Sequence, residues 1–300
     1  MRQKNKRRKI PQKFCYLAYS MYLCPDKEPL KQADKSESYG MNKVASLFKP
    51  LMPILSAVYG LGIIYITALP VDGNHPTFVG EMLTCLITLA GIAMTLYLVR
   101  YVEPKVFPAA EQFPLKLPTI SVILGLLLIA PLKLVAEGNI VYGMTSLAQP
   151  VMMAPLTYTT EELHEDLLSS IHAVLLAPLL EELCFRQMAI SPFRSRGVQV
   201  VVCVVMALLF GMLHVRNFPG AFLSALVYGG VFIWSRNIWY SVILHAGSNL
   251  AATLLAVYCW LQLGDMQMAK IPVIILPDMK VVIASLFLAI AGLLLLKKKR

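Results

Sequence analysis

Apolar residues fill eight windows of the chain that are each long enough to cross a lipid bilayer. A membrane-spanning helix needs about 17–25 predominantly apolar residues, and only helices or closed barrels satisfy their backbone hydrogen bonds in lipid. The pattern therefore predicts an all-α polytopic membrane protein with about eight transmembrane helices that enclose a polar cavity. The windows lie at about 50–69, 81–101, 118–136, 169–190, 198–214, 219–235, 238–261 and 280–296.

Polar stretches between the windows divide the chain into four expected parts. Residues 1–49 form a basic cytoplasmic leader that we expect to be partly disordered. Residues 50–168 hold the first three helices and an external loop that starts at about residue 137. The sequence TTEELHEDLL in this loop predicts an amphipathic or interfacial helix. Residues 169–261 form the core with the next four helices, and residues 262–300 hold the last helix and a basic tail.

The composition agrees with a membrane protein. Hydrophobic residues make up 57% of the chain and charged residues 15%, whereas soluble domains carry about 25% charged residues. The net charge of +10 comes largely from MRQKNKRRK at the start and KKKR at the end. Such basic runs bind anionic lipids at a membrane surface, so we expect lipid and not nucleic acid as their partner.

The loops between the windows differ in charge from one side of the membrane to the other. An even number of helices places both ends of the chain on one side, and cytoplasmic loops carry an excess of lysine and arginine. The charges therefore predict an integral protein of the plasma (inner) membrane with both termini in the cytoplasm. The expected cytoplasmic loops hold Arg100, Lys105, Lys116, Arg194, Arg196 and Arg236. The opposite loops hold Asp72, Glu81, Glu137, Glu161, Glu162, Glu165, Asp166 and Asp265.

The segment LLEELCFR brings three charged side chains, Glu181, Glu182 and Arg186, into an apolar window. One charged residue in the middle of a membrane costs about 3 kcal/mol, so a function is the first hypothesis for three. Glu182 and Arg186 are four residues apart and can pair, whereas Glu181 points about 100° away. We expect Glu181 to be the working carboxylate and Pro178 to loosen the helix. The alternative is a buried salt bridge that only packs helices.

Two later windows also carry polar side chains at helical spacing. Phe210 and His214 share a face in LLFGMLHVRN, and His245 and Asn249 share a face in ILHAGSNL. A single histidine or asparagine inside a membrane is usually a structural hydrogen-bonding group. One water-filled cavity shared by three helices would satisfy all of these groups, so we expect them to converge.

Such a set of side chains permits peptide hydrolysis. Glu181, helped by His214, can take a proton from a water molecule that attacks a peptide carbonyl. His245 and Asn249 can donate hydrogen bonds to the oxyanion that develops. The alternative is a zinc site in which Glu181, His214 and His245 hold the metal and a water molecule. The residue types alone do not separate these two mechanisms.

Three short motifs occur in order on successive helices. EELCFR, FGMLH and HAGSN match the patterns EExxxR, FxxxH and HxxxN at every defining position. In these motifs, over about residues 170–255, the chain resembles the CPBP or Abi family, the CAAX-processing and bacteriocin-processing intramembrane endopeptidases. The resemblance implies that Glu181 is the water-activating base with His214, and that His245 and Asn249 stabilise the oxyanion. It further implies supporting or packing roles for Glu182, Arg186 and Phe210.

The resemblance also carries expectations about cofactor, substrate and origin. It implies a glutamate mechanism that requires no cofactor, with zinc as the alternative, and a membrane-anchored or transmembrane peptide or protein as substrate. The eukaryotic branch removes the last three residues of prenylated proteins and carries further histidines just after its second motif. This chain has Val215, Arg216 and Asn217 there, which favours a prokaryotic member.

Two other functions and one geometric difficulty remain open at this stage. Glutamate, histidine and arginine also line ion paths, as in a proton-coupled transporter. A non-catalytic bacteriocin-immunity or scaffold protein is a further alternative.

The difficulty is the depth of the site in the membrane. If the fifth helix starts at about residue 198, His214 lies about 24 Å along it. Glu181 and His245 would then lie nearer the opposite membrane face.

Overall fold

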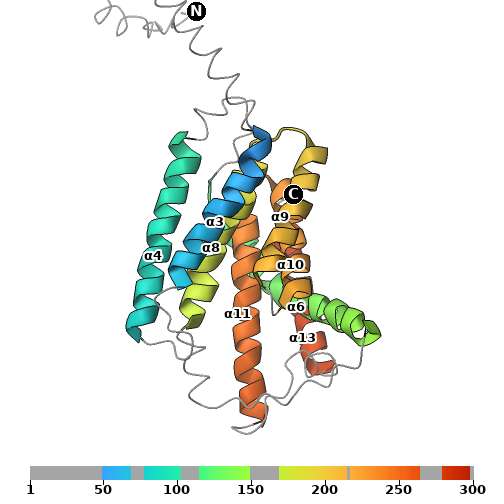
Figure 1. Cartoon of the computed structure of the whole chain (residues 1–300). Helices are drawn as coiled ribbons and strands as arrows, with labels where there is room; N and C mark the ends of the chain where they lie inside the picture. Colours follow the sequence, from blue (N-terminus) through green and yellow to red (C-terminus); the bar gives the residue numbers. More distant parts are fainter. Residues whose placement is uncertain are drawn as a thin grey trace, which may run out of the picture. The chain divides into compact units, whose positions relative to one another are not determined.

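The computed structural model describes residues 49–68, 78–102, 115–148, 169–214, 217–263 and 279–297, and this part of the chain is helical and without strands (Figure 1). All of these residues belong to one compact unit, Ala45–Arg300. The basic leader, the helix expected at TTEELHEDLL and the basic tail beyond Lys297 lie outside the described residues. The elements are η1 (Lys49–Leu51), α3 (Met52–Ala68), α4 (Phe78–Tyr97), η2 (Leu98–Val102), α6 (Ile120–Ala148), η3 (His172–Leu176), α8 (Ala177–Glu182), η4 (Leu183–Met188), α9 (Arg196–Leu213), α10 (Phe218–Ser235), α11 (Ile238–Leu263) and α13 (Met279–Lys297).

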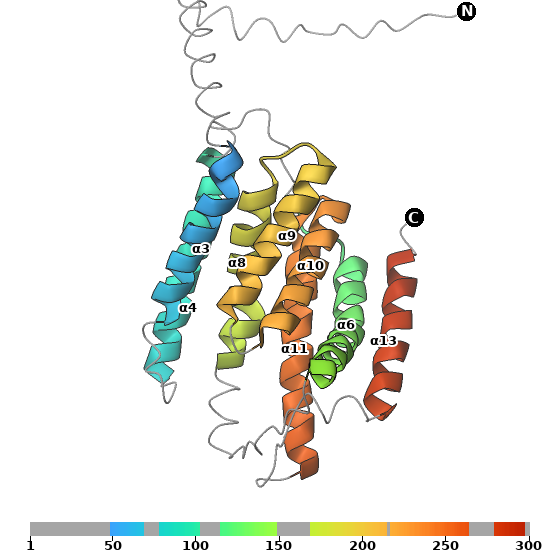
Figure 2. The ribbon, with the colours of Figure 1, turned by 45° about the vertical axis from the view of Figure 1, so that its right-hand side comes forward.

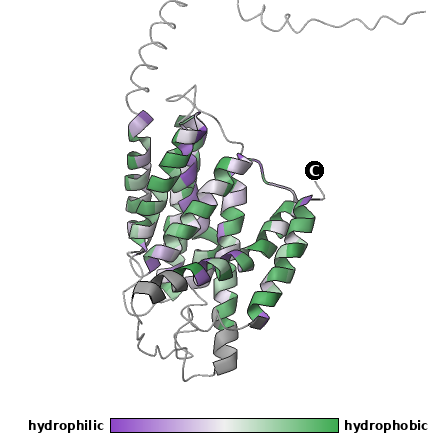
Figure 3. Cartoon of the chain, turned by 90° about the vertical axis from the view of Figure 1, so that its right-hand side faces the viewer, coloured by the Kyte–Doolittle hydropathy of each residue, from purple (hydrophilic) through white to green (hydrophobic). Residues whose placement is uncertain are grey.

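Seven of the described helices are long and apolar enough to cross a membrane. Their outward faces expose large apolar side chains, including Leu86, Trp234 and Phe287, and apolar residues cover most of the ribbon in Figure 3. Such surfaces are stable in contact with lipid hydrocarbon, where they need no burial against protein. The chain is therefore an integral membrane protein, and the expectation of an all-α polytopic fold is confirmed.

The remaining one of the eight expected helices is the fourth in chain order, at residues 169–190. It forms in pieces with different hydrogen-bond patterns. Two π-helical segments, η3 and η4, flank the α-helical α8, and Pro178 lies in the first turn of α8. A proline has no backbone N–H to donate, and π-helical segments are a frequent response to such an interruption. The segment also contains Glu181, Glu182 and Arg186, so it is more polar than the seven apolar spans.

Helix α6 is much longer than the apolar window predicted. It continues to Ala148, so the expected external loop does not begin at residue 137. The prediction was wrong because Glu137 was read as a loop residue. Its side chain is buried and lies 2.8 Å from Lys133 Nζ, one helical turn earlier. An ion pair at this spacing allows an apolar helix to continue through both charges.

The helices pack mainly against their sequence neighbours and around α6. Helix α9 packs on α10, and α6 lies between α11 and α13. At the α6–α13 contact, a Cβ atom on Gly292 would lie 2.5 Å from the Gly125 carbonyl oxygen. Small residues at such crossings let two membrane helices approach closely. Figure 2 shows that α3 begins and α13 ends at the same end of the bundle.

Candidate active site

A cavity of about 330 Å³ opens between α6, the helix at residues 169–190, α10 and α11. Its wall includes Glu181 from α8, His214 just after α9, and His245 and Asn249 from α11. The structure therefore brings together the four residues singled out from the sequence. His172 and Tyr228, which the sequence analysis did not consider, also line it.

Glu182 lies beside this cavity, in the protein interior. One of its carboxylate oxygens is 3.1 Å from Arg186 Nη1 and 3.0 Å from His245 Nδ1. The other accepts a hydrogen bond from Ser241 Oγ. Its side chain is 0% exposed. A buried carboxylate is stable only when paired and hydrogen-bonded, and three partners meet that need. The expected Glu182–Arg186 pair is present.

Glu181 has different surroundings although it is the next residue. Its side chain is 13% exposed, it lines the cavity, and its ion contact is with His245 Nε2 at 3.7 Å. Successive residues point about 100° apart on a helix, which places the two carboxylates in different environments. Glu181 is therefore the carboxylate that a water molecule or substrate in the cavity can reach.

Arg186 connects the helix at residues 169–190 to α9 and α10. Its Nη2 atom donates a hydrogen bond to the Ala225 carbonyl oxygen at 3.2 Å, which links η4 to α10. Its guanidinium also lies 5.1 Å from the centre of the Phe210 ring. Buried arginine gains from both kinds of contact, a hydrogen-bond acceptor and an aromatic face.

Phe210 contacts both cavity histidines. The centroid of its ring lies 4.5 Å from that of His214 and 6.2 Å from that of His245, and its edge packs against Phe185 at 5.5 Å. The ring thereby sets the separation of the two imidazoles. His214 and His245 line one cavity, which removes the difficulty of depth raised by helix length alone.

The hydrogen bonds of the two histidines determine which ring nitrogen carries hydrogen. His214 Nδ1 lies 2.9 Å from the Phe210 carbonyl oxygen, and His245 Nδ1 lies 3.0 Å from the Glu182 carboxylate. Carbonyl and carboxylate oxygens only accept, so each Nδ1 donates. Each neutral ring then presents Nε2 as an acceptor. In this neutral form, His245 has no hydrogen left to donate into the cavity.

Asn249 is also partly engaged. Its Nδ2 atom donates to the Ala173 carbonyl oxygen at 2.7 Å, and Ala173 lies in the π-helical segment η3. A carboxamide nitrogen has two hydrogens, so one remains for the cavity. The bond joins α11 to the irregular helix, and it fixes the side of the amide that faces the cavity.

Four further polar residues form a hydrogen-bonded group on α6 and α10. Lys133 Nζ lies 2.7 Å from Ser224 Oγ, 2.7 Å from Tyr228 Oη and 2.8 Å from Glu137 Oε2. Ser224 Oγ donates to the same Glu137 oxygen at 2.7 Å. The sequence contained a signal for this group, because Lys133 is a charged residue in an apolar window with a carboxylate four residues later. Nothing in the sequence marks Tyr228.

The third cavity histidine, His172, is held by α4. Thr88 Oγ1 donates to the Thr84 carbonyl oxygen at 2.7 Å and lies 2.9 Å from His172 Nε2. Because Thr88 has already used its one hydrogen, His172 Nε2 donates in this contact. His172 lies three residues after residue 169, where the described part of this helix begins, and it belongs to none of the three sequence motifs.

The residues considered for zinc do not form a metal site. In the part of the chain that the structure describes, no three histidine, cysteine, aspartate or glutamate side chains gather closely enough to hold a metal ion. Zinc needs three or four such ligands within about 2.3 Å of one point. Glu181, His214 and His245 therefore share a cavity without the geometry of a zinc site.

The comparison with known families agrees with this geometry. Residues 163–251 match the family model described as type II CAAX prenyl endopeptidase, Rce1-like. This segment is therefore similar to the Rce1-like CAAX endopeptidases. The match contains all three motifs and the four cavity residues from Glu181 to Asn249. The match supports, at the level of the family, a CAAX protease-like membrane endopeptidase. No curated protein and no solved structure gives a significant match.

Proposed function

We propose that this cavity hydrolyses a peptide bond of a membrane-associated protein or peptide, with water activated by Glu181 and without a required cofactor. The observation that carries the proposal is the contrast between two adjacent carboxylates. Glu182 has three polar partners, whereas Glu181 is the one carboxylate among the residues that line the described cavity. A general base must reach its water molecule, and Glu181 meets this condition.

The reaction needs one proton transfer in each direction. A water molecule gives a proton to the Glu181 carboxylate as its oxygen attacks the substrate's carbonyl carbon. The π electrons of the carbonyl move to its oxygen, which forms an oxyanion. When the oxyanion collapses, the C–N bond breaks and the leaving amine takes the proton from Glu181. Glu181 is then ionised again, and a carboxylic acid and an amine leave the site.

The histidines support this step as hydrogen-bond acceptors. In their neutral forms, His214 and His245 present Nε2 lone pairs, and the Nε2 atom of His245 lies 3.7 Å from Glu181. A water molecule that donates one hydrogen to Glu181 and the other to an imidazole is held in one orientation. Glu182 keeps the His245 ring in the required tautomer. The second hydrogen of the Asn249 amide is a donor for the oxyanion.

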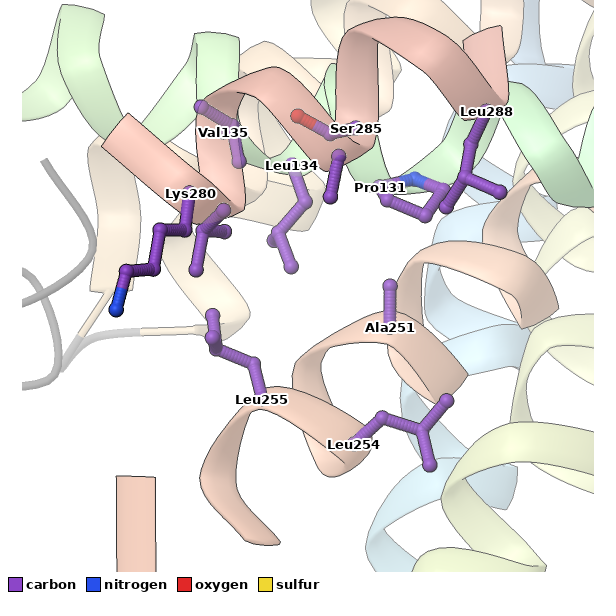
Figure 4. Close-up of a pocket in the computed structure, with 11 residues that line it drawn as sticks. Pro131, Leu134, Val135, Ala251, Leu254, Leu255, Lys280, Ser285 and Leu288 are labelled. Carbon is purple, nitrogen blue, oxygen red and sulfur yellow. The ribbon is translucent and has the colours of Figure 1, made fainter. Parts of the chain in front are cut away.

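The proposed substrate carries a hydrophobic membrane anchor. A second cavity of about 360 Å³ opens between α6, α11 and α13, and its wall is almost entirely apolar. Figure 4 shows Leu134, Leu254 and Leu255 around this space. Leu134 lines both cavities. The matched family is described by its action on prenylated CAAX proteins, so we propose that the second cavity holds the hydrocarbon of a lipid-modified substrate.

We propose the plasma membrane as the site of action, with both termini in the cytoplasm. The start of α3 and the end of α13 lie at one end of the bundle (Figure 2). Arg194 precedes α9, Arg196 is the first residue of α9, and Arg236 follows α10. Positive residues in such connections favour the cytoplasmic side.

Comparative membrane proteomics tests the function and identifies substrates. Cells with the wild-type chain are compared with cells carrying Glu181→Ala. Substrates accumulate in their uncleaved form in the variant cells, because the base is missing. Glu81→Gln is the matched control: Glu81 is a buried carboxylate on α4 that does not line the cavity. Identical cleavage products in wild-type and Glu181→Ala cells would rule out the proposal.

A further inference from the structure

The hydrogen bonds of Lys133 leave the hydroxyl hydrogen of Tyr228 unused. An ammonium group has three hydrogens and no lone pair, so Lys133 donates to each of its partners, which are Ser224, Glu137 and Tyr228. Tyr228 Oη is therefore an acceptor in this contact. Among the described residues, no acceptor is recorded for the hydrogen that Tyr228 itself carries.

The Tyr228 side chain also borders the cavity. Tyr228 and Lys133 both line the cavity that contains Glu181. The Tyr228 ring stacks on His245 with centroids 4.4 Å apart and an interplanar angle of 19°. Tyr228 is 2% exposed, so its position is fixed by packing. A buried hydroxyl at the wall of a cavity, with no acceptor among the described residues for its own hydrogen, can donate that hydrogen to a ligand atom.

The proposed reaction needs such a hydrogen-bond donor in the cavity. The proposed reaction places a negative charge on the substrate's carbonyl oxygen, and sites of this kind supply preorganised hydrogen-bond donors to it. The Nδ1 hydrogens of His214 and His245 are used by Phe210 and Glu182. Asn249 has one hydrogen left after its bond to Ala173. Asn249 thus supplies a single donor, whereas oxyanion sites usually supply more than one.

We propose that the Tyr228 hydroxyl donates a hydrogen bond to this oxyanion and that Lys133 is a positioning residue for it. The proposal rests on the proposed function and adds a catalytic residue outside the three motifs. No bond is made or broken at Tyr228: the phenol keeps its hydrogen, and the carbonyl electron pair moves to oxygen on attack and returns on collapse. The charge of Lys133, 2.7 Å from Oη, makes the hydroxyl a stronger donor, because hydrogen bonds in a chain polarise one another.

The first test is Tyr228→Phe in the full-length protein, purified and reconstituted in liposomes with a cleavable peptide substrate. The variant keeps the ring that stacks on His245 and removes only the hydroxyl. We expect kcat to fall about 100-fold or more with KM changed less than about threefold, because the lost bond exists only in the transition state. Tyr59→Phe is the control: the Tyr59 hydroxyl, 3.1 Å from Thr95 Oγ1, lies outside the cavity wall, and its loss should leave kcat unchanged.

A second variant tests Lys133 and covers the case in which Tyr228→Phe does not fold. Lys133→Met with Glu137→Gln removes the ion pair, leaves no unpaired buried charge and retains Tyr228. We expect kcat to fall at least about tenfold, and the triple variant that also carries Tyr228→Phe to be no slower than Tyr228→Phe alone, because both changes act on one hydrogen bond. A kcat within about threefold of wild type in Tyr228→Phe, or in the double variant if only that one folds, overturns the proposal. Such a result leaves the proposed function standing, because that depends on Glu181.

Discussion

The Nδ1 atom of His245 lies 3.0 Å from a carboxylate oxygen of Glu182, within the helix bundle. This bond makes Glu182 the residue that orients the imidazole, and it turns Nε2 towards Glu181 at 3.7 Å. The two glutamates of the first motif therefore have separate tasks. Glu181 faces the cavity, and Glu182 stabilises the groups around it.

We expect Glu182→Gln to lower both stability and activity. Arg186 would lose its ionic partner while still only 3% exposed, and breaking a buried pair destabilises by about 3–5 kcal/mol. His245 would also lose the charge that holds its tautomer. Thermal unfolding and peptide cleavage of the same purified preparation measure the two effects. An unchanged unfolding temperature would contradict the assigned role of Glu182.

Glu181→Gln should lower activity without lowering stability. Its carboxylate has one long ion contact, with His245, so neutralising it removes little that holds the fold together. Removal of a functional charge from a buried site often leaves stability equal or higher. We predict an unfolding temperature equal to or above that of wild type. A clear loss of stability would show that Glu181 is mainly a structural residue.

Phe210→Leu tests the ring that separates the two histidines. Leucine retains an apolar side chain but removes the contacts with His214 and His245. We expect cleavage to fall about tenfold or more, because small misplacements of catalytic groups have large effects on rate. Leu208→Ala, at an exposed position on the same helix, is the control. Full activity in Phe210→Leu would mean that the ring is only packing.

The apolar cavity predicts a substrate preference. Ala284 lines this cavity, and Ala284→Trp would fill much of it. We expect KM to rise about tenfold for a lipid-modified peptide and to stay unchanged for the same peptide without lipid, because buried hydrocarbon contributes about 0.8 kcal/mol per CH₂ group. Leu293→Trp, on the exposed face of α13, is the control. Equal effects on both peptides would remove the cavity from substrate binding.

Close packing of α6 and α13 should depend on Gly292. A side chain there would meet the Gly125 carbonyl oxygen at 2.5 Å, so Gly292→Leu must move the two helices apart. Overpacking of this kind destabilises by about 1–3 kcal/mol. A lower unfolding temperature in detergent is the expected result. Gly138→Ala, where a new Cβ atom meets nothing within 4 Å, should have no such effect, and equal stability of the two variants would contradict the packing.

Most of the helices could be predicted from the sequence because their apolar windows have the length that a bilayer requires. Helix α10, for example, was expected at about 219–235 and spans Phe218–Ser235. The prediction failed at α6, where Glu137 looked like a loop residue. Its partner Ser224 lies on another helix, α10, and the mean hydropathy of a window counts Lys133 and Glu137 as two separate charges although they pair one helical turn apart.

The candidate site was predictable as far as helical spacing extends. The i,i+4 rule gave the Glu182–Arg186 pair and the face shared by His245 and Asn249. It did not give the bonds from His245 to Glu182 or from Asn249 to Ala173. These depend on how α11 is placed against the helix at residues 169–190 and on the π-helical turn at Ala173. The same contacts determine which hydrogens of His245 and Asn249 are already bonded within the protein and which can be donated to a substrate.

The proposed mechanism depends above all on Glu181 as the base that activates the attacking water. The single-turnover cleavage rate of purified Glu181→Gln in liposomes, compared with the rates of wild type and Glu81→Gln, tests this role. We predict a rate at least about 100-fold below wild type for Glu181→Gln, since general bases contribute about 10²–10⁴-fold, and an unchanged rate for Glu81→Gln. Cleavage by Glu181→Gln within about threefold of wild type would contradict it.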